Sequence, residues 1–318
     1  MMKLATFVML FLSCLAAFAE DSAKQPDVDM QAIKVSDHVW YVEGKAGTAT
    51  ENEGFVSNAS FIITGDGVVL YDSLGTPALA ELLLKEIRKL TNEPIRKVIV
   101  SHYHADHIYG LQVFKDEGAE ILAPAGVIDY LNSDSANSRL QERRVSLAPW
   151  VNENTRLVAP DRYIKESEKF KLGEIEFTIS ALGSAHSEGD LTLFVEPDKV
   201  LFSGDVIFDG RIPWLGDADT VNWLATLNNI KTAKPVAIVP GHGGLSNDPE
   251  ALIKLTYNYL KFVREKMKAA VDDWVPFDDA YDEVDWGEYE YLPAFFEANR
   301  RNAYQVYLSL EQESLGSK

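Results

Sequence analysis

The sequence predicts a layered α/β fold. Short apolar runs typical of strands fall into two clusters, and longer amphipathic runs typical of helices separate them. Several strand-like runs end at a histidine or an aspartate, which indicates a functional site at the edge of a sheet. With 318 residues and a hydrophobic content of 46%, the chain is large enough for one large domain or two.

The first cluster lies before residue 150. Strands are expected over 38–43, 60–64, 68–71 and 96–101. Helices are expected over 77–90, 111–116 and 125–140. Gly65-Asp66-Gly67 separates two of these strands as a hairpin turn, and basic residues near the end of 77–90 favour a helix there.

The second cluster begins near residue 160. Strands are expected over 162–164, 170–172, 175–181, 191–196, 200–203 and 236–239. Helices are expected over 220–231, 249–271 and 292–310. The segment 272–290 has nine acidic residues and no basic one, so we expect an acidic surface loop whose aromatic side chains pack on the core.

Residues 1–19 read as a signal peptide, because Lys3 precedes an apolar run that ends in Ala17-Phe18-Ala19. The run is short for a membrane span. We therefore expect a periplasmic or secreted protein with no integral membrane segment after cleavage, in which 20–35 is a linker. The only cysteine, Cys14, lies in this signal, and a lipoprotein is less favoured because Phe11 stands where leucine is usual. The mature chain would have no thiol, which suits an oxidising compartment.

The formal charge of −19 argues against nucleic acid and anionic membranes as partners. A small-molecule substrate is expected instead, and it can be anionic if bound metal ions supply a local positive field. The sequence does not indicate an oligomeric state.

The densest group of chemically active residues is His102-Tyr103-His104-Ala105-Asp106-His107, directly after an apolar run. Imidazole and carboxylate in this spacing suit zinc, manganese or iron. Two other histidines, His186 and His242, also follow apolar runs, whereas His38 stands apart and is expected to be structural. Five of the six histidines thus point to one shared metal site.

With Ser203-Gly204-Asp205 and the upstream Asp72, these segments resemble the metallo-β-lactamase superfamily of binuclear hydrolases over 36–250. The resemblance implies a four-layer αββα sandwich, with 251–318 as a C-terminal helical extension. It implies seven metal ligands: His102, His104 and His186 for the first metal, Asp106, His107 and His242 for the second, and Asp205 as the bridge. Asp72 is similar to the family's carboxylate that orients a ligand imidazole.

This ligand set implies two Zn²⁺ ions, with iron or manganese as alternatives. Two such ions acidify a bridging water, and the resulting hydroxide attacks an ester, lactone, thioester or β-lactam. Asp106 and Asp205 are therefore the expected catalytic residues. Ser187 is not expected to act as a nucleophile, since the nearby histidines are committed to metal.

A bridging Asp205 is similar to the glyoxalase II type and departs from the class B lactamases. Residues 204–217, together with the export signal, look like those of the SoxH-related and quinoprotein-relay-system zinc metallohydrolases. Three alternatives stay open: a glyoxalase II-like thioesterase, an iron-dependent persulfide dioxygenase and a non-catalytic metal-binding accessory protein. The loop 44–58 is expected to overhang the site. Four residues beside the ligand segments either line a pocket or pack: Tyr103, Tyr109, Arg211 and Trp214.

Overall fold

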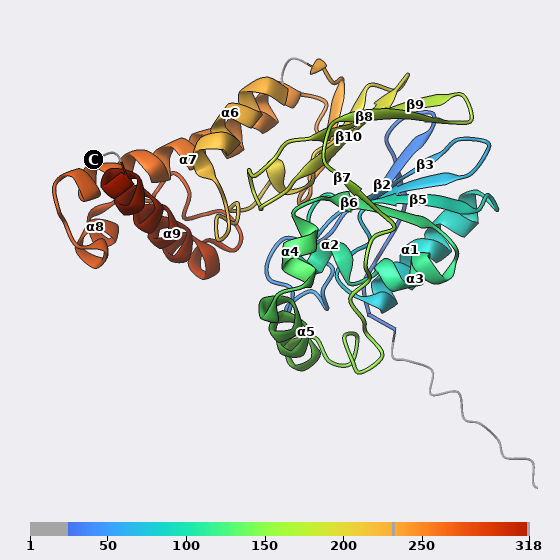
Figure 1. Ribbon diagram of the computed structural model, residues 1–318, viewed down its shortest axis with the longest axis horizontal. Coiled ribbons are helices and arrows are strands. Elements are labelled where there is room, and N and C mark those ends of the chain that lie inside the picture. Colours follow the sequence, from blue (N-terminus) through green and yellow to red (C-terminus); the bar gives the residue numbers. More distant parts are fainter. Residues whose placement is uncertain (1–24, 231–232, 317–318) are drawn as a thin grey trace, which may run out of the picture.

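Two β-sheets lie face to face, and helices cover the outer side of each sheet (Figure 1). The expected αββα sandwich is therefore confirmed, as are helices at the C-terminal end. The computed structural model describes residues 25–230 and 233–316. The expected signal peptide, with Cys14, lies outside the described residues.

The first sheet is antiparallel in its N-terminal half and parallel in the rest. Its strands follow chain order: β1 (Ile33–Lys34), β2 (Val39–Val42), β3 (Ala59–Ile63), β4 (Val68–Tyr71), β5 (Ile95–Ile99), β6 (Glu120–Pro124) and β7 (Arg162–Ile164). Helices α1 (Pro77–Leu90) and α3 (Leu111–Asp116) pack on its outer face. The sequence reading missed β6 and the short edge strand β1, which lies inside the expected linker.

The second sheet has the order β12-β11-β10-β9-β8, and only β11 and β12 run parallel. Its strands are β8 (Glu168–Leu172), β9 (Ile175–Ala181), β10 (Leu191–Glu196), β11 (Val200–Phe202) and β12 (Ala237–Val239). Three helices lie on its outer side: α6 (Thr220–Ile230), α7 (Pro249–Asp272) and α9 (Phe295–Gly316). Helix α7 shares one apolar core with α6 and α9. The expected domain boundary at residue 250 stays a prediction.

Each space between layers holds its own apolar core. Strand β4 shows how the sequence supplies two of them. Val68 and Leu70 point to the helices α1 and α3, whereas Val69 and Tyr71 point to the second sheet. All four residues are buried because both faces of this sheet are covered.

Two further regions differ from the expectation. The single helix expected over 125–140 is two helices, α4 (Val127–Leu131) and α5 (Asp134–Ser146). The chain breaks at Asn132 because the Ser133 side chain caps α5 by accepting the Ala136 N–H.

The acidic segment 272–290 contains a helix, α8 (Phe277–Glu283), and is not a simple loop. Its aromatic side chains pack on the core as expected at Trp286 and Tyr289, whereas Trp274 is 86% exposed.

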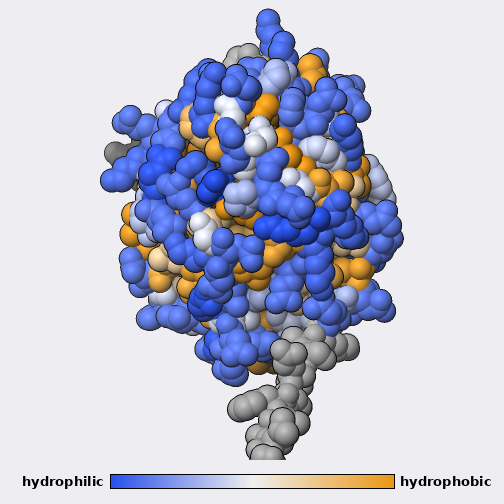
Figure 2. Space-filling model, turned by 90° about the vertical axis from the view of Figure 1, so that its right-hand side faces the viewer, coloured by the Kyte–Doolittle hydropathy of each residue, from blue (hydrophilic) through white to orange (hydrophobic). Residues whose placement is uncertain are grey.

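The exterior is consistent with the charge of the chain. Figure 2 shows a mainly hydrophilic face in which hydrophobic residues occupy narrow areas between polar ones. Of the helices in the described ranges, none is both long and apolar enough to span a bilayer.

Candidate metal centre

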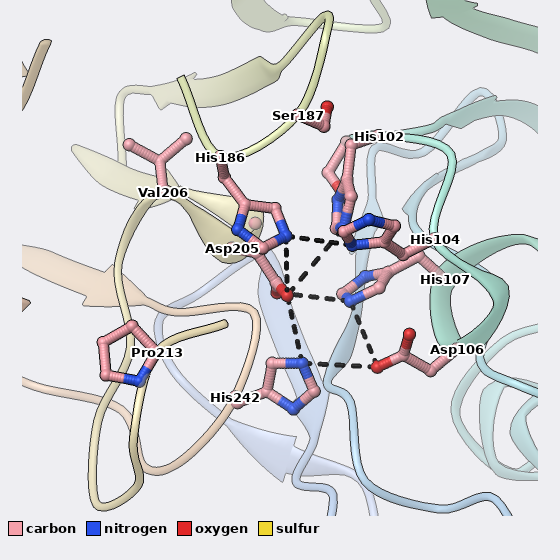
Figure 3. A network of polar contacts seen from close by, with 12 residues as sticks. His102, His104, Asp106, His107, His186, Ser187, Asp205, Val206, Pro213 and His242 are labelled. Atoms are coloured by element: carbon pink, nitrogen blue, oxygen red, sulfur yellow. Dashed lines mark hydrogen bonds and ion pairs between the residues drawn. The ribbon is translucent and has the colours of Figure 1, made fainter. Parts of the chain in front are cut away.

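The candidate ligands come from segments that follow strands of both sheets, and their side chains point toward one another (Figure 3). His102 follows β5, and His104 precedes the short helix α2 (Ala105–Ile108), which carries Asp106 and His107. His186 lies between β9 and β10. Asp205 lies in the 3₁₀ turn η1 (Gly204–Val206) after β11, and His242 follows β12.

The structure brings all seven expected ligands together in two groups. The first is His102, His104, His186 and Asp205, and the second is Asp106, His107 and His242. Within each group the donor atoms lie within 4.8 Å of one another. Asp205 reaches both groups, because its Oδ1 is 3.2 Å from His107 Nε2 and its Oδ2 is 3.4 Å from His186 Nε2. We call these seven residues the metal cluster.

The donor spacing fits divalent metal ions. Two atoms bound to one tetrahedral zinc at about 2.0–2.1 Å lie roughly 3.3 Å apart. The atoms His186 Nε2 and His104 Nδ1 are 3.0 Å apart, and His242 Nε2 is 3.3 Å from Asp106 Oδ2. His102 Nε2, His107 Nε2 and Asp205 Oδ1 are buried and make no hydrogen bond. Buried polar atoms without partners are costly, and bound cations would satisfy these three.

For His102, His186 and Asp205 the electrostatics also favour the forms that bind a metal. Burial, reinforced by His107, holds the pKa of His102 well below its ordinary value. Burial lowers the pKa of His186 to about 3. Both imidazoles are therefore neutral, which leaves a lone pair for a metal. Burial opposes ionisation of Asp205, but His242 and His107 outweigh it and hold the pKa of this carboxyl well below its usual range. His107 and His242 differ, because burial lowers their pKa but Asp205 and other neighbouring groups outweigh it and raise the pKa.

Hydrogen bonds outside the cluster orient its imidazoles. Asp72 Oδ2 lies 2.9 Å from His107 Nδ1, and it also accepts the Ser101 hydroxyl at 2.7 Å. Ser101 Oγ is in turn 2.9 Å from His102 Nδ1. When these Nδ1 atoms carry the proton, each Nε2 faces the cluster with a free lone pair.

The other two contacts of this kind involve a backbone carbonyl and a second carboxylate. His242 Nδ1 lies 2.7 Å from the Val56 carbonyl, and His104 Nε2 lies 3.4 Å from Asp217 Oδ2. Sequence reasoning did not find Ser101, although it stands next to His102, and it did not find the role of Asp217.

Backbone geometry sets the position of Asp205. A Cβ atom on Gly241 would lie 2.0 Å from Asp205 Oδ1, so only glycine allows this approach. Asn58, also missed from sequence, ties the turn after β12 to the loop 44–58. Its side-chain amide donates to the carbonyls of Pro240 and Gly243, each at 2.8 Å.

A cavity of about 760 Å³ opens onto the cluster. The expected overhang of 44–58 is confirmed, because Thr48, Ala49 and Val56 line this cavity. Of the four undecided residues, Tyr103, Arg211 and Trp214 line it, whereas Tyr109 is buried in the core. Helices α5 and α9 supply walls that the sequence did not predict.

Ser187 is not placed to act as a nucleophile. Its side chain is fully buried and donates to Asp190 Oδ1 at 2.9 Å. Figure 3 shows it turned away from the metal cluster. Asp190 also accepts the backbone N–H groups of Ala185 and Ser187, so it holds the turn around His186.

Fold and site together define a metal-dependent hydrolase. The sequence model of the metallo-beta-lactamase superfamily matches residues 52–242, and the chain belongs to this superfamily. The expected family is thus confirmed.

Three comparisons illustrate the relationship. The chain is 25% identical over 274 residues to the metallo-beta-lactamase type 2 of Elizabethkingia meningoseptica, which covers 85% of this chain and 98% of that protein. It is 27% identical over 172 residues to the acyl-coenzyme A thioesterase MBLAC2 of Gallus gallus, covering 51% of this chain and 61% of the relative. A solved metallo-beta-lactamase from Pontibacter korlensis superposes with a TM-score of 0.59 at 20% identity, over 73% of this chain and 99% of that one.

Proposed function

We propose that this protein is an exported, binuclear zinc-dependent hydrolase that cleaves an ester, thioester, lactone or β-lactam. The observation that carries the proposal is the convergence of seven nitrogen and oxygen donors with spacings suited to two metal ions. In this proposal His102, His104 and His186 hold one ion, Asp106, His107 and His242 hold the other, and Asp205 binds both.

The donor set supports zinc, because histidine and carboxylate are usual zinc ligands, while iron and manganese accept the same groups. Two divalent cations held by these residues would supply an acidified water as the nucleophile and polarise the scissile carbonyl. The chain's own residues orient the donors and limit the access of water. Asp72 and Ser101 fix imidazole tautomers from behind, and the loop 44–58 covers part of the opening.

The side chains near the metal cluster are consistent with acyl transfer that uses no protein nucleophile. Ser187 is buried against Asp190, and the described residues include no cysteine. Hydrolysis of a thioester is the second candidate, since one relative is named as an acyl-coenzyme A thioesterase. The apolar run before Glu20 supports export to the periplasm or the medium.

The test begins with metal analysis of the purified protein and its melting temperature before and after chelation. We expect two metal ions per chain and a lower melting temperature after their removal, because the metal-free cluster buries unpaired donors. At most one tightly bound ion after zinc loading would contradict the binuclear assignment.

A substrate panel then addresses the reaction. We expect the zinc form to hydrolyse at least one of a thioester, a lactone, an aryl ester and a chromogenic cephalosporin. No turnover of the panel, together with oxygen consumption by the iron form on glutathione persulfide, would instead support a dioxygenase. Mass analysis of exported protein that retains residues 1–19 would contradict signal cleavage.

A further inference from the structure

Arg301 on helix α9 lines the cavity without an acidic partner. Its guanidinium lies over the indole of Trp214, with Cζ 4.7 Å from the ring centroid, and the side chain is exposed. No carboxylate of residues 25–230 or 233–316 lies within ion-pair distance of it. The neighbouring Arg300 differs, because it pairs with Asp278 at 2.7 Å and Asp282 at 3.2 Å outside the cavity.

The structure holds Trp214 firmly under Arg301. The buried side chain of Asn302 donates to the Pro213 carbonyl at 2.7 Å and accepts the Leu215 N–H at 2.9 Å. These two backbone groups flank Trp214. A Cβ atom on Gly216 would lie 2.6 Å from Trp214 Nε1, so this glycine leaves room for the indole. A guanidinium on a fixed aromatic face keeps its N–H edge available for a planar or tetrahedral oxyanion.

With two metal ions bound, the charges that line the cavity would favour an anion near this position. Six carboxylates and four guanidinium groups line it, the latter being Arg139, Arg143, Arg211 and Arg301. Two bound divalent cations would convert the excess of negative charge into an excess of positive charge. Asp106 and Asp205 belong to the metal cluster, and Asp217 contacts His104 and Tyr103.

A second cationic side chain in the cavity also lacks a suitable acceptor. Arg211 Nε is buried without a hydrogen-bond partner, and Arg211 Nη1 lies 3.3 Å from His242 Nδ1. That nitrogen donates its proton to Val56, so it does not accept one from Arg211. Positive charge in the cavity is therefore less compensated than the acidity of the whole chain suggests.

We propose that Arg301, held over Trp214, binds a carboxylate or phosphate group of the substrate at a distance from the bond that is cleaved. This inference rests on the proposed hydrolase function and deepens it, because it assigns the substrate to oxyanion-bearing acyl compounds. The extended helix α9 then completes the substrate site that the sandwich begins.

The test measures binding to the zinc-loaded protein by calorimetry and does not depend on turnover. The probes are phenylacetate, phenylphosphonate and the neutral phenylacetamide. Arg301→Ala should weaken binding of the preferred anion about tenfold, as expected for loss of one charge-assisted hydrogen bond. It should leave phenylacetamide unchanged, and Arg301→Lys should retain part of the affinity. The anion that binds more tightly identifies the oxyanion.

The control is Arg300→Ala, which removes the same charge one residue away and should not change binding of any probe. Equal anion affinity in wild type and Arg301→Ala would overturn the proposal, since the anion would then bind at the metals. Equal losses in the Arg300 and Arg301 variants would also overturn it, because the effect would be general electrostatics. Failure of the hydrolysis panel leaves these binding results interpretable and bears on the proposed function alone.

Discussion

The metal cluster and the C-terminal wall, which we define as Trp214, Arg301 and Asn302, border the same cavity but are built differently. In the cluster, His102, His107 and His186 have no exposed area, and the donors lie in loops, the short helix α2 and the turn η1, all of which follow strands of the two sheets. In the wall, Arg301 is exposed on a helix outside the sheets. In our two proposals the sandwich positions the reactive groups, whereas helix α9 contributes to substrate recognition.

Asp205→Ala should have the largest effect, because this carboxylate contacts both groups of the cluster. We expect turnover to fall about a thousandfold and metal content to fall below two ions per chain. Kinetics and elemental analysis of the same sample check both results. Asp37→Ala, at a carboxylate whose side chain is 92% exposed, is the control and should behave as wild type. Near-normal activity of Asp205→Ala would refute the ligand assignment.

Asp72→Asn should have the next largest effect. Asp72 has a left-handed backbone with φ of 64°, which asparagine also adopts, so the substitution keeps the turn. The amide cannot replace both carboxylate oxygens toward His107 and Ser101. We expect a loss of about 10- to 100-fold in metal affinity or activity. Metal titration with a chromophoric chelator measures it, and unchanged affinity would show that Asp72 is not needed to orient His107.

The residues of the metal cluster could be predicted from the sequence, whereas those of the C-terminal wall could not. Each ligand follows an apolar run in a short motif, so local pattern located it and the family resemblance ordered the set. Asn302 and Arg301 carry no such signal, because they meet Trp214 only through the packing of α9. Tertiary contacts of this kind produce no periodic pattern in the sequence.

The secondary structure shows a similar limit. Helix α1 and strand β4 were predicted with their observed bounds, since capping, turn and apolar signals agree there. Strand β6 was missed because Glu120–Pro124 ends in proline, which argues against a strand. The division between α4 and α5 was missed because a serine cap inside a polar stretch does not by itself reveal a break.

Asn302→Ala should have a smaller effect on catalysis, because it disturbs the C-terminal wall and leaves the metal cluster intact. The change leaves the Pro213 carbonyl and the Leu215 N–H without their partner, which costs about 1–3 kcal/mol for each buried group. We expect a lower melting temperature and a higher KM, with kcat and metal content nearly unchanged.

The matched control is Asn299→Ala. Asn299 is also fully buried and bonds to Tyr259 and Tyr281, but its side chain makes no hydrogen bond to the loop that carries Trp214. It should lower the melting temperature without raising KM. If both variants raise KM alike, Asn302 acts through general stability and has no specific role in positioning Trp214.

Tyr103→Phe should have the smallest effect. The Tyr103 ring stacks on Tyr130 with centroids 4.4 Å apart, and its hydroxyl is 3.3 Å from Asp217 Oδ2. Phenylalanine keeps the stack and leaves Asp217 in contact with His104. Because the lost hydrogen bond is long and partly solvated, we expect kcat/KM to change by less than about threefold. Tyr103→Ala, which also removes the ring, should raise KM further. A large fall in kcat for Tyr103→Phe alone would mean that the hydroxyl contacts the reacting group. Tyr103 would then belong with the metal cluster as a residue that takes part in the reaction.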